Sequence, residues 1–221
     1  MNKNLTILGC SALSICVVFD MLKECTQINK FNIYKNIDDD ILPYFINHKY
    51  DYEIFNSDVL PDANSKTIFG LATPFNKWSV FQHFKKCAGI SEANYCTFIH
   101  PSACISPTVH IKNGVLIEPS VVVSSQSIIG FGVNLKRGSL IGHHNNIGDF
   151  VDINPGAVLS GSVNIGKGTI IGSGTTIIEN ITVGDNCLIG AGSIVTHNIP
   201  SGTVAYGNPC RKVKDNDKWL I

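Results

Sequence analysis

The sequence carries little charge, and the charges it has are balanced. Only 15% of its 221 residues are Asp, Glu, Lys or Arg, and 17 basic residues offset 17 acidic ones. A neutral chain with a pI near 7.0 lacks the basic surface that binds DNA, RNA or anionic membranes, so we expect none of these as partners. The scarcity of charge also indicates that a partner subunit covers part of the surface.

Long hydrophobic runs are absent as well. Asp20 interrupts the longest apolar stretch near the amino terminus, and no segment approaches the roughly 20 apolar residues of a membrane span. Residues 1–10 lack the charged and apolar regions of a signal peptide. We therefore expect a cytoplasmic protein.

Cysteines are present, but their spacing does not pair them. None of the eight forms a C-x-x-C motif; they are Cys10, Cys16, Cys25, Cys87, Cys96, Cys104, Cys187 and Cys210. In a cytoplasmic chain this pattern predicts reduced, mostly buried thiols. A catalytic cysteine is the alternative, and the spacing gives it no support.

The first part of the chain, residues 1–97, alternates between apolar strands and helical stretches. Trp78, Phe81 and Phe84 recur at helical spacing after Pro74, a residue that suits the start of a helix. Short strands are expected at residues 5–8, 31–34, 52–55 and 67–72, and a first helix is expected to end near residue 24. The alternation predicts a small α/β domain, a parallel sheet with helices packed on it.

In the second part, residues 98–221, a period of six replaces this alternation. Every sixth residue from 99 to 195 is aliphatic, without an insertion: Ile99, Ile105, Ile111, Ile117, Val123, Ile129, Leu135, Ile141, Ile147, Ile153, Leu159, Ile165, Ile171, Ile177, Val183, Ile189 and Val195. One inward aliphatic per hexapeptide predicts a parallel β-helix, in which three hexapeptides form a triangular coil of eighteen residues. Neighbouring coils stack about 4.8 Å apart. The repeat resembles that of the hexapeptide-repeat acyltransferases, which implies a left-handed helix and a homotrimer.

The register converts sequence numbers into positions on the β-helix. His143 lies two residues after Ile141, and Gly161 lies eighteen residues later, so Gly161 should stack directly on His143. Ser125 and Glu179 belong to the same column. An imidazole beside an uncrowded glycine amide can remove a proton from a nucleophile and stabilise an oxyanion.

Other residues near this register have weaker assignments. Asp152 follows His143 by half a coil, so in a trimer it can face the same cleft from the neighbouring chain. No metal site is expected, because the adjacent His143 and His144 on a strand would point in opposite directions. The remaining histidines suit surface positions; they are His48, His83, His100, His110 and His197. Of these, His100 is expected to serve the first turn of the repeat.

Several motifs narrow the resemblance. After the α/β segment come F-I-H-P-S-A at 98–103, I-G-H at 141–143, I-G-D-F at 147–150, N-P-G-A at 154–157 and Y-G-N-P-C-R-K-V at 206–213. Together they make the chain similar to sugar acetyltransferases of the sialic acid O-acetyltransferase type. That family includes enzymes that N-acetylate a nucleotide-linked amino-deoxysugar for bacterial surface glycans. The resemblance extends over essentially the whole chain and is strongest from residue 98 to 214.

The resemblance implies acetyl transfer from acetyl-CoA, in active sites between the subunits of a homotrimer. His143 matches the general base of the family, and the Gly161 amide matches the donor that holds the acetyl carbonyl oxygen. Ser173 and Ala191 match amides that bind the pantetheine arm of acetyl-CoA. Asp152 stands where related N-acetyltransferases often carry a histidine near the acetyl group.

The carboxy-terminal segment matches the part of the family that lies beside the CoA nucleotide. The matching residues are Asn208, Pro209, Arg211 and Lys212. The resemblance assigns all four to acetyl-CoA binding, and the cations of Arg211 and Lys212 suit its phosphates.

Directly after the base, the chain departs from the family pattern. The family usually has Asp or Glu there, and the carboxylate makes the base stronger, whereas this chain has His144. A neutral imidazole cannot supply that effect, and a charged one would oppose it. Either Asp149 or Asp152 replaces the carboxylate, or the acceptor is an amine that needs less help, which favours N- over O-acetylation.

The first loop departs as well. The family loop typically reads G-x-x-G-H, whose glycines let the backbone approach a nucleotide phosphate, but here residues 9–13 read G-C-S-A-L. The acidic pair usual after the second strand is replaced by Lys35 and Asn36. The resemblance still assigns nucleotide-sugar binding to Gly9, Cys10, Ser11 and Lys35, with UDP, GDP and dTDP all open. A purely structural domain is the alternative.

The leading hypothesis is therefore an acetyl-CoA-dependent N-acetyltransferase acting on a nucleotide-linked amino-deoxysugar, as in lipopolysaccharide O-antigen biosynthesis. One alternative is O-acetylation of a sugar hydroxyl, such as that of a sialic acid. Another, of a different class, is a non-catalytic hexapeptide-repeat scaffold. Acetyl-CoA binding separates the scaffold from both enzymes, because a scaffold has no need of a CoA groove.

Overall fold

The computed structural model describes residues 4–11, 14–28, 30–37, 50–218 and 220–221. Ala12, Leu13 and His48, named above, lie outside these described residues. Contacts along the chain divide it into two compact units, Met1–Phe98 and Ile99–Ile221.

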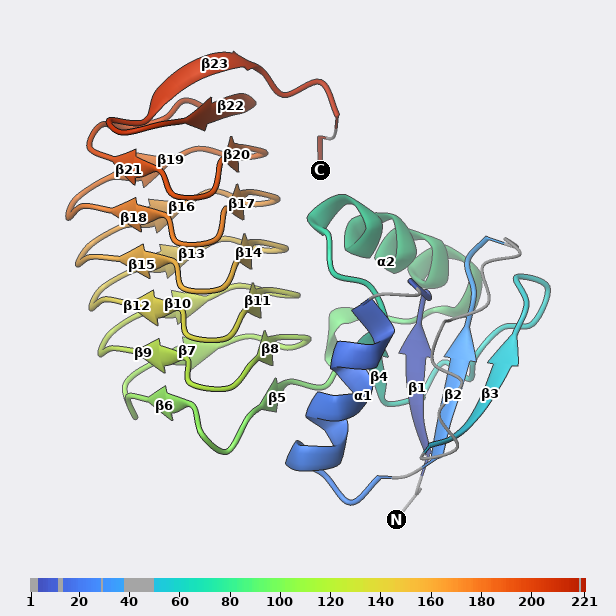
Figure 1. The fold of residues 1–221 in the computed structure, drawn as a ribbon. Coiled ribbons are helices and arrows are strands. Elements are labelled where there is room, and N and C mark those ends of the chain that lie inside the picture. Colours follow the sequence, from blue (N-terminus) through green and yellow to red (C-terminus); the bar gives the residue numbers. More distant parts are fainter. Residues whose placement is uncertain (1–3, 12–13, 29, 38–49, 219) are drawn as a thin grey trace. The chain divides into compact units, whose positions relative to one another are not determined.

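The N-terminal unit is an α/β structure, as its alternating sequence predicts (Figure 1). In order along the chain it contains β1 (Asn4–Leu8), α1 (Ser14–Cys25), β2 (Lys30–Tyr34), β3 (Asp51–Phe55), β4 (Thr67–Phe69), α2 (Pro74–Ala88) and a single-turn helix η1 (Glu92–Asn94). The described strands pair in parallel in the order β3-β2-β1-β4. Their carboxyl ends therefore share one edge, which brings the loops after β1 and β2 together.

Local sequence explains both longer helices of this unit. α1 buries Ile15, Phe19 and Leu22 along one side, and the Phe19 ring lies 4.9 Å from that of Phe31 on β2. α2 begins at Pro74, whose fixed φ suits the first turn, and ends at Gly89, which adopts a left-handed φ of 69°. Neither helix is both long enough and apolar enough to span a bilayer, nor is any other helix among the described residues.

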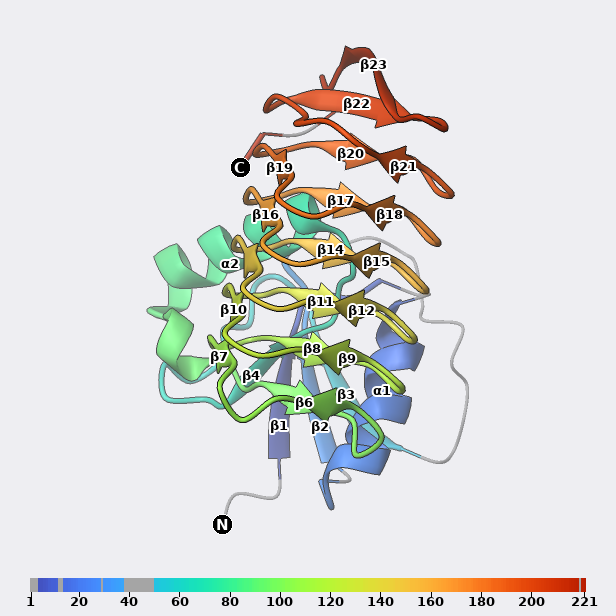
Figure 2. The same ribbon diagram turned by 90° about the vertical axis from the view of Figure 1, so that its left-hand side faces the viewer.

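The C-terminal unit is a left-handed parallel β-helix, again as predicted (Figure 2). Its two-residue strands form three faces. Face 1 contains β5 (Phe98–Ile99), β8 (Leu116–Ile117), β11 (Asn134–Leu135), β14 (Asp152–Ile153), β17 (Ile170–Ile171) and β20 (Leu188–Ile189). Face 2 contains β6 (Cys104–Ile105), β9 (Val122–Val123), β12 (Leu140–Ile141), β15 (Val158–Leu159), β18 (Thr176–Ile177) and β21 (Ile194–Val195). Face 3 contains β7 (His110–Ile111), β10 (Ile128–Ile129), β13 (Asn146–Ile147), β16 (Asn164–Ile165) and β19 (Thr182–Val183).

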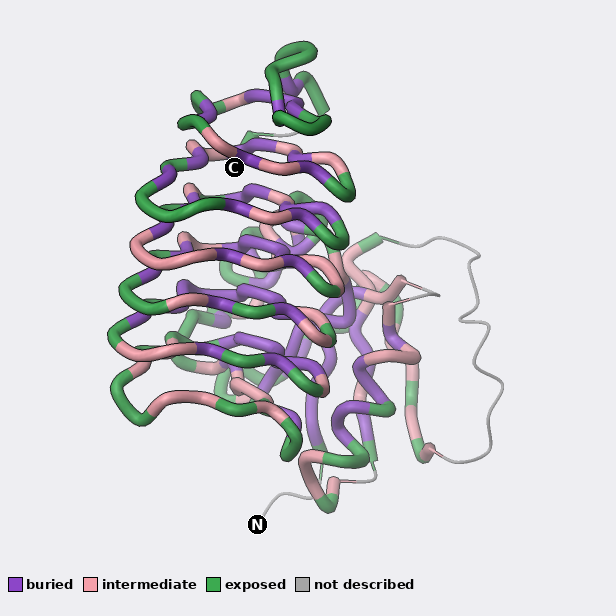
Figure 3. The backbone as a smooth tube through the Cα atoms, turned by 60° about the vertical axis from the view of Figure 1, so that its left-hand side comes forward, coloured by how far each residue is buried: buried purple, intermediate pink, exposed green. Residues whose placement is uncertain are grey.

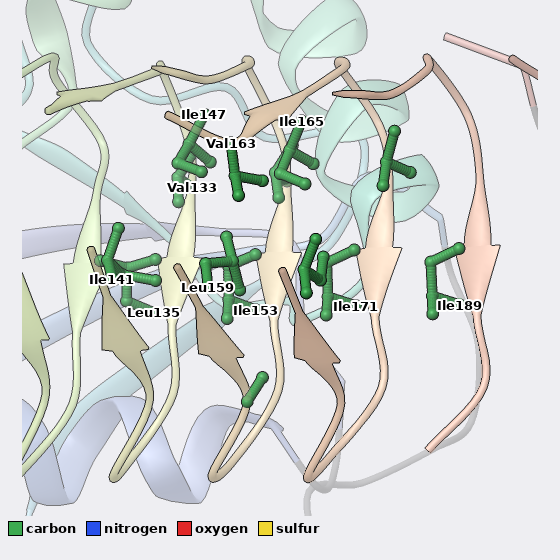
Figure 4. Packing of buried hydrophobic residues seen from close by; sticks show 14 of the residues in the cluster. Val133, Leu135, Ile141, Ile147, Ile153, Leu159, Val163, Ile165, Ile171 and Ile189 are labelled. Carbon is green, nitrogen blue, oxygen red and sulfur yellow. The ribbon is translucent and has the colours of Figure 1, made fainter. Parts of the chain in front are cut away.

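The repeat of six builds the core of this unit. Every periodic aliphatic is the second residue of a strand, and Ile141 pairs with Val123 on one neighbouring coil and Leu159 on the other, eighteen residues away in each direction. From Ile117 to Val195 these side chains are at most 3% exposed. Figure 4 shows them stacked inside the coils. The coil at the open end is less covered, since Ile99 is 39% exposed.

The corners between strands follow one conformational rule. In most corners the third residue after the aliphatic turns the chain with a positive φ, and glycine often takes this place. Non-glycine residues adopt the same conformation elsewhere, including Gln126 (60°), His144 (58°), Ser162 (58°) and Asn180 (61°). We name each corner by the faces that it joins, so that corner 2–3 connects face 2 to face 3.

A hairpin closes the end of the β-helix. β22 (Thr203–Tyr206) extends face 1 parallel to β20, and β23 (Arg211–Asp215) pairs antiparallel with β22. The outer strand β23 is exposed along its whole length (Figure 3). The hairpin covers the last coil while leaving a row of basic side chains in solvent.

The expectation of mostly buried cysteines was wrong. All eight are free thiols, but only Cys187 and Cys210 are buried, while Cys87 and Cys104 are exposed. Cys104 is exposed because it is the outward residue of β6, and Cys87 because it lies in the last turn of α2. Burial raises the pKa of the Cys187 and Cys210 thiols, which keeps them protonated and unreactive.

A matched pair of substitutions on β10 tests the core. Ile129 is 0% exposed and Ile128, its neighbour, is 44% exposed. We expect Ile129→Ala to lower the free energy of unfolding by about 3 kcal/mol, because it leaves a cavity between coils. Ile128→Ala should cost less than about 1 kcal/mol. Equal losses in chemical denaturation would contradict the inward and outward assignment of the two side chains.

Candidate active site

His143 and His144 occupy corner 2–3, between β12 and β13, and both side chains are exposed. One serine from an adjacent coil fixes the backbone around them. The Ser127 hydroxyl donates to the carbonyl of Gly142 (2.9 Å) and accepts from the N–H of Asn145 (3.1 Å). It therefore joins the two ends of the turn that carries both histidines.

Ser127 was not singled out from the sequence, although a signal was present. It takes the fourth place after an aliphatic, where Val133, Val151 and Val163 fill the core elsewhere. A hydroxyl at such a buried place must find hydrogen-bond partners. Thr169 holds the corresponding turn of another corner in the same way, with bonds to the Gly184 carbonyl and the Cys187 N–H.

Gly161 lies on the adjacent coil, against the ring of His143. A Cβ atom at Gly161 would lie 2.5 Å from Cε1 and 2.6 Å from Nε2 of His143, closer than side-chain atoms approach one another. The backbones are joined as well, because the Ser162 N–H donates to the carbonyl of His143 (2.8 Å). The absence of a side chain at Gly161 is what lets the ring occupy this place.

The amide of Gly161 remains available to a ligand. Its carbonyl accepts from Asn180 (3.1 Å), but among the described residues no acceptor is found for its N–H. An uncommitted N–H beside an imidazole edge can hold a developing oxyanion while the imidazole takes a proton. Corner 2–3 therefore presents a base and an oxyanion donor on adjacent coils.

The two histidine rings meet each other, and the expectation that they point in opposite directions was wrong. Their Nδ1 atoms are 3.0 Å apart and the ring planes are 85° to one another. The expectation treated both residues as part of a strand, whereas the left-handed φ of His144 turns its side chain back toward His143. The two rings form a hydrogen-bonded pair.

Neither candidate aspartate reaches His143 within this chain. Asp149 lies in corner 3–1, where one carboxylate oxygen accepts from Lys112 Nζ (3.0 Å) and from the Phe131 N–H (2.8 Å). Asp152 is the outward residue of β14 on face 1, only 2% exposed, and pairs with Lys136 Nζ at 3.6 Å. In this chain His144, and neither carboxylate, partners the ring of His143.

The residues expected to bind acetyl-CoA divide between separate parts of the β-helix. Ser173 and Ala191 are exposed in corner 1–2, so they share the hexapeptide position of Gly161 but not its corner. The remaining four, Asn208, Pro209, Arg211 and Lys212, are exposed in the closing hairpin. Lys212 pairs with Asp215 (2.6 Å).

The expected nucleotide-sugar residues of the N-terminal unit gather at one sheet edge. Gly9, Cys10 and Ser11 follow β1, and Lys35 follows the neighbouring β2. Backbone donors expected to face a phosphate are already used, however. Gly9 N–H donates to the Tyr34 carbonyl (2.9 Å) and Ser11 N–H to the Gly70 carbonyl (3.3 Å).

Packing explains why glycine is needed at residue 9. Its φ is 74°, and a Cβ there would lie 2.6 Å from Leu71 Cδ1 and 2.8 Å from Val80 Cγ2. A hollow of about 530 Å³ lies at the opposite, amino-terminal end of the sheet, where Asn4, Asn32 and Lys66 contribute to its lining. The edge with Gly9 thus has the expected residues, and among its described N–H groups those of Gly9 and Ser11 already have backbone acceptors.

The remaining histidines play mixed roles. His110 and His197 are exposed, as expected. His100 is buried instead, although its Nδ1 does serve the first turn of the repeat, where it accepts from the Ser102 N–H (3.1 Å). His83 also differs, since its Nε2 is buried. Within the described ranges, no three His, Cys, Asp or Glu side chains are grouped as metal ligands.

Comparisons with known proteins agree with this architecture. Residues 162–197 match the family model described as bacterial transferase hexapeptide (six repeats). No curated protein matches the chain. Among solved structures, the acetyltransferase domain of PglB from Neisseria gonorrhoeae, in complex with acetyl coenzyme A, has a TM-score of 0.79 and 24% identity over 96% of this chain and 100% of that one.

Two further structures are similar over nearly the whole chain. PerB from Caulobacter crescentus, in complex with CoA and GDP-perosamine, has a TM-score of 0.74 and 20% identity over 96% of this chain and 97% of its own. WeeI from Acinetobacter baumannii has a TM-score of 0.80 and 20% identity over 95% of this chain and 100% of its own. At these identities the likeness establishes a shared fold.

The role of Ser127 in holding the histidine turn can be measured. We expect Ser127→Ala to lower the free energy of unfolding by about 1–3 kcal/mol, because it leaves the buried Asn145 N–H and the half-buried Gly142 carbonyl without their partner. Ser125→Ala makes the same chemical change two residues away, at a half-buried place, and should cost less than about 0.5 kcal/mol. If chemical denaturation finds the same loss of stability for both variants, Ser127 does not hold the histidine turn.

Proposed function

We propose that the protein is an acetyl-CoA-dependent acetyltransferase that N-acetylates the amino group of a nucleotide-linked amino-deoxysugar for bacterial surface glycans. The observation that carries the proposal is the packing of the His143 ring against Gly161, whose N–H has no acceptor among the residues that the structure describes. Acyl transfer needs a base for the attacking group and a donor for the carbonyl oxygen. These two residues offer both.

In this reaction the acceptor nitrogen bonds to the acetyl carbonyl carbon, and the C–S bond of the thioester breaks. Nε2 of His143 takes the proton that the nitrogen loses and returns it to the departing sulfur, so CoA leaves as a thiol. The Gly161 N–H stabilises the negative charge that forms on the carbonyl oxygen. No net proton or electron is exchanged with the protein.

An amine suits this base better than a hydroxyl. The partner of His143 is the imidazole of His144 (Nδ1 to Nδ1, 3.0 Å), and Asp149 and Asp152 pair with lysines elsewhere. A base without a carboxylate partner is weaker. An amine that is unprotonated at neutral pH needs less activation than an alcohol, which supports N- over O-acetylation.

The acceptor and donor classes are supported by the structural likenesses. PglB, in the structure named above, holds acetyl coenzyme A, and PerB holds CoA with GDP-perosamine. We assign acetyl-CoA to Ser173, Ala191 and the closing hairpin, and the nucleotide sugar to the sheet edge with Gly9 and Lys35. Since acetyl-CoA is a cytoplasmic metabolite, the proposal also locates the reaction in the cytoplasm.

The division of the expected site between corners supports a homotrimer. His143 and Gly161 lie in corner 2–3, whereas Ser173 and Ala191 lie in corner 1–2. A single acetyl-CoA can touch both sets when corners of two copies meet. Face 2 also exposes a strip of apolar side chains beside His143, with Val122 39% and Leu140 42% exposed, which suits contact with another subunit.

Incubation with acetyl-CoA and candidate acceptors tests the proposal, with release of free thiol as the readout. The panel contains amino-deoxysugars linked to UDP, GDP and dTDP, together with a sialic acid as a hydroxyl acceptor. We expect turnover with at least one amino sugar. Turnover with the sialic acid alone would replace the proposal by O-acetylation, and calorimetry without acetyl-CoA binding would favour a scaffold.

Removal of the base gives a sharper test on the active acceptor. We expect His143→Ala to lower kcat by about 10²–10⁴-fold, the usual contribution of a general base, while the thermal unfolding temperature changes little. His110→Ala removes another exposed histidine, on face 3, and should keep the wild-type rate. A His143→Ala variant with nearly full activity would rule out the proposed base.

Gly161→Ala tests the packing between base and amide. Because the added Cβ would lie 2.5 Å from Cε1 of His143, the ring must move, and a displacement near 1 Å costs about 10²-fold in rate. We expect kcat/KM to fall by about that factor. In a His143→Ala background the same change should have little further effect, because the ring that it displaces is gone. If the two substitutions lowered kcat/KM by independent factors that multiply, residue 161 would not act through the ring of His143.

A further inference from the structure

We propose that His144 is a positioning residue for His143: its unprotonated Nδ1 accepts a hydrogen bond from the Nδ1–H of His143. That bond leaves Nε2 of His143 as the unprotonated nitrogen, the one that receives the acceptor's proton. The inference rests on the proposed function for its catalytic meaning. The arrangement of the proton itself can be measured without any turnover.

The distance between the rings requires that they share one proton. The Nδ1 atoms are 3.0 Å apart, within hydrogen-bond range. Two unprotonated nitrogens at this distance would repel, and so would two protonated ones. A neutral imidazole carries its proton on one nitrogen only. If His143 holds the shared proton at Nδ1, then its Nε2 is necessarily the free base.

The corner holds His144 in place for this contact. Its backbone N–H donates to the carbonyl of Ser125 on one adjacent coil (2.9 Å), and its φ of 58° directs the side chain toward His143. On the other side, the His143 ring is confined by Gly161. Both rings are thus oriented by neighbouring coils and by the Ser127 hydrogen bonds.

The fold does not itself require a histidine at this place. In the same column Gln126, Ser162 and Asn180 adopt nearly the same φ, between 58° and 61°. Different side chains therefore close the same turn. The imidazole of His144 adds what those side chains lack at this point, a nitrogen acceptor beside the ring of His143.

Within the described part of the β-helix, the places beside the pair carry no opposite charge. The corner residues on the adjacent coils are Ser125 and Gln126 on one side and Gly161 and Ser162 on the other. The outward strand residues beside the corner are also uncharged: Val122, Leu140 and Val158 on face 2, and Ile128, Asn146 and Asn164 on face 3. Glu179, two coils away in the same column, is the nearest carboxylate along it.

The partner of His143 matters for pH dependence. The base acts only through an unprotonated Nε2, so kcat/KM falls when the pH is low enough to protonate that nitrogen. A carboxylate at residue 144 would stabilise the charged form, so the acidic limb of the profile would move to higher pH.

Nitrogen-15 NMR of the imidazole rings tests the position of the proton. The full chain is labelled at histidine, and the signals of His143 are identified by their loss in His143→Gln. At a pH where both rings are neutral, we expect Nδ1 of His143 to be protonated and Nε2 unprotonated. The reverse pattern would overturn the proposal, whether or not the protein turns over an acceptor.

Substitutions at residue 144 give the second readout. His144→Asn keeps an acceptor and tolerates a positive φ, so the NMR pattern and most of kcat should be retained. His144→Gly removes the acceptor, and we expect mixed tautomers at His143 with about a tenfold lower kcat, the value of one hydrogen bond. His144→Asp should raise the midpoint of the acidic limb by about one pH unit or more.

Gln126→Asn is the matched control, because it changes the same column and the same backbone conformation one coil away. It should leave the His143 signals, kcat and the pH profile as in the wild type. If His144→Gly keeps the wild-type tautomer and rate, His144 does not position the base. If the wild type has no activity but the expected tautomer, the proposed function fails while the hydrogen bond stands.

Discussion

The pairing of residues eighteen apart is the constraint on which the β-helix depends. Backbone hydrogen bonds between coils place each aliphatic over another, and from Ile117 to Val195 these side chains are at most 3% exposed. A shift of one residue would turn such a ladder outward, so the register cannot slip without losing the core. Ile141 and Leu159 are partners in this ladder. His143 and Gly161, two residues after each, are held together by the same pairing.

The corners can vary because the strands are fixed. Most corners have one residue with a positive φ, and the polar groups that face inward take partners from the same corner or from the adjacent coil. Ser127 supplies those partners in the corner of His143, as Thr169 does in another. Side chains that point outward in the corners contribute less to the packing of the core than the aliphatics do. They are therefore the places where a base, an amide donor or a cation can be added to this fold at little cost in stability.

The sequence was enough to predict the repeat, the stacking of Gly161 on His143 and the strands of the N-terminal unit, because each follows from periodicity. It was not enough for side-chain contacts in the corners. The positive φ of His144 reverses the direction that a strand would give its ring. Asp149 and Asp152 find Lys112 and Lys136, whose positions depend on long side chains. The roles in catalysis and ligand binding remain predictions, since they depend on groups outside this chain.

The lack of a carboxylate partner for His143 and the choice of an amine acceptor are connected, because the two kinds of acceptor need bases of different strength. An alcohol must lose its proton as it attacks, so its base has to be strong, and a carboxylate partner supplies that strength. An unprotonated amine attacks with its own lone pair, and the nitrogen becomes acidic only after the new bond begins to form. A base of ordinary strength then suffices, provided that its free nitrogen faces the acceptor. Orientation matters more than basicity for such a reaction, and orientation is what a second imidazole at 3.0 Å can provide.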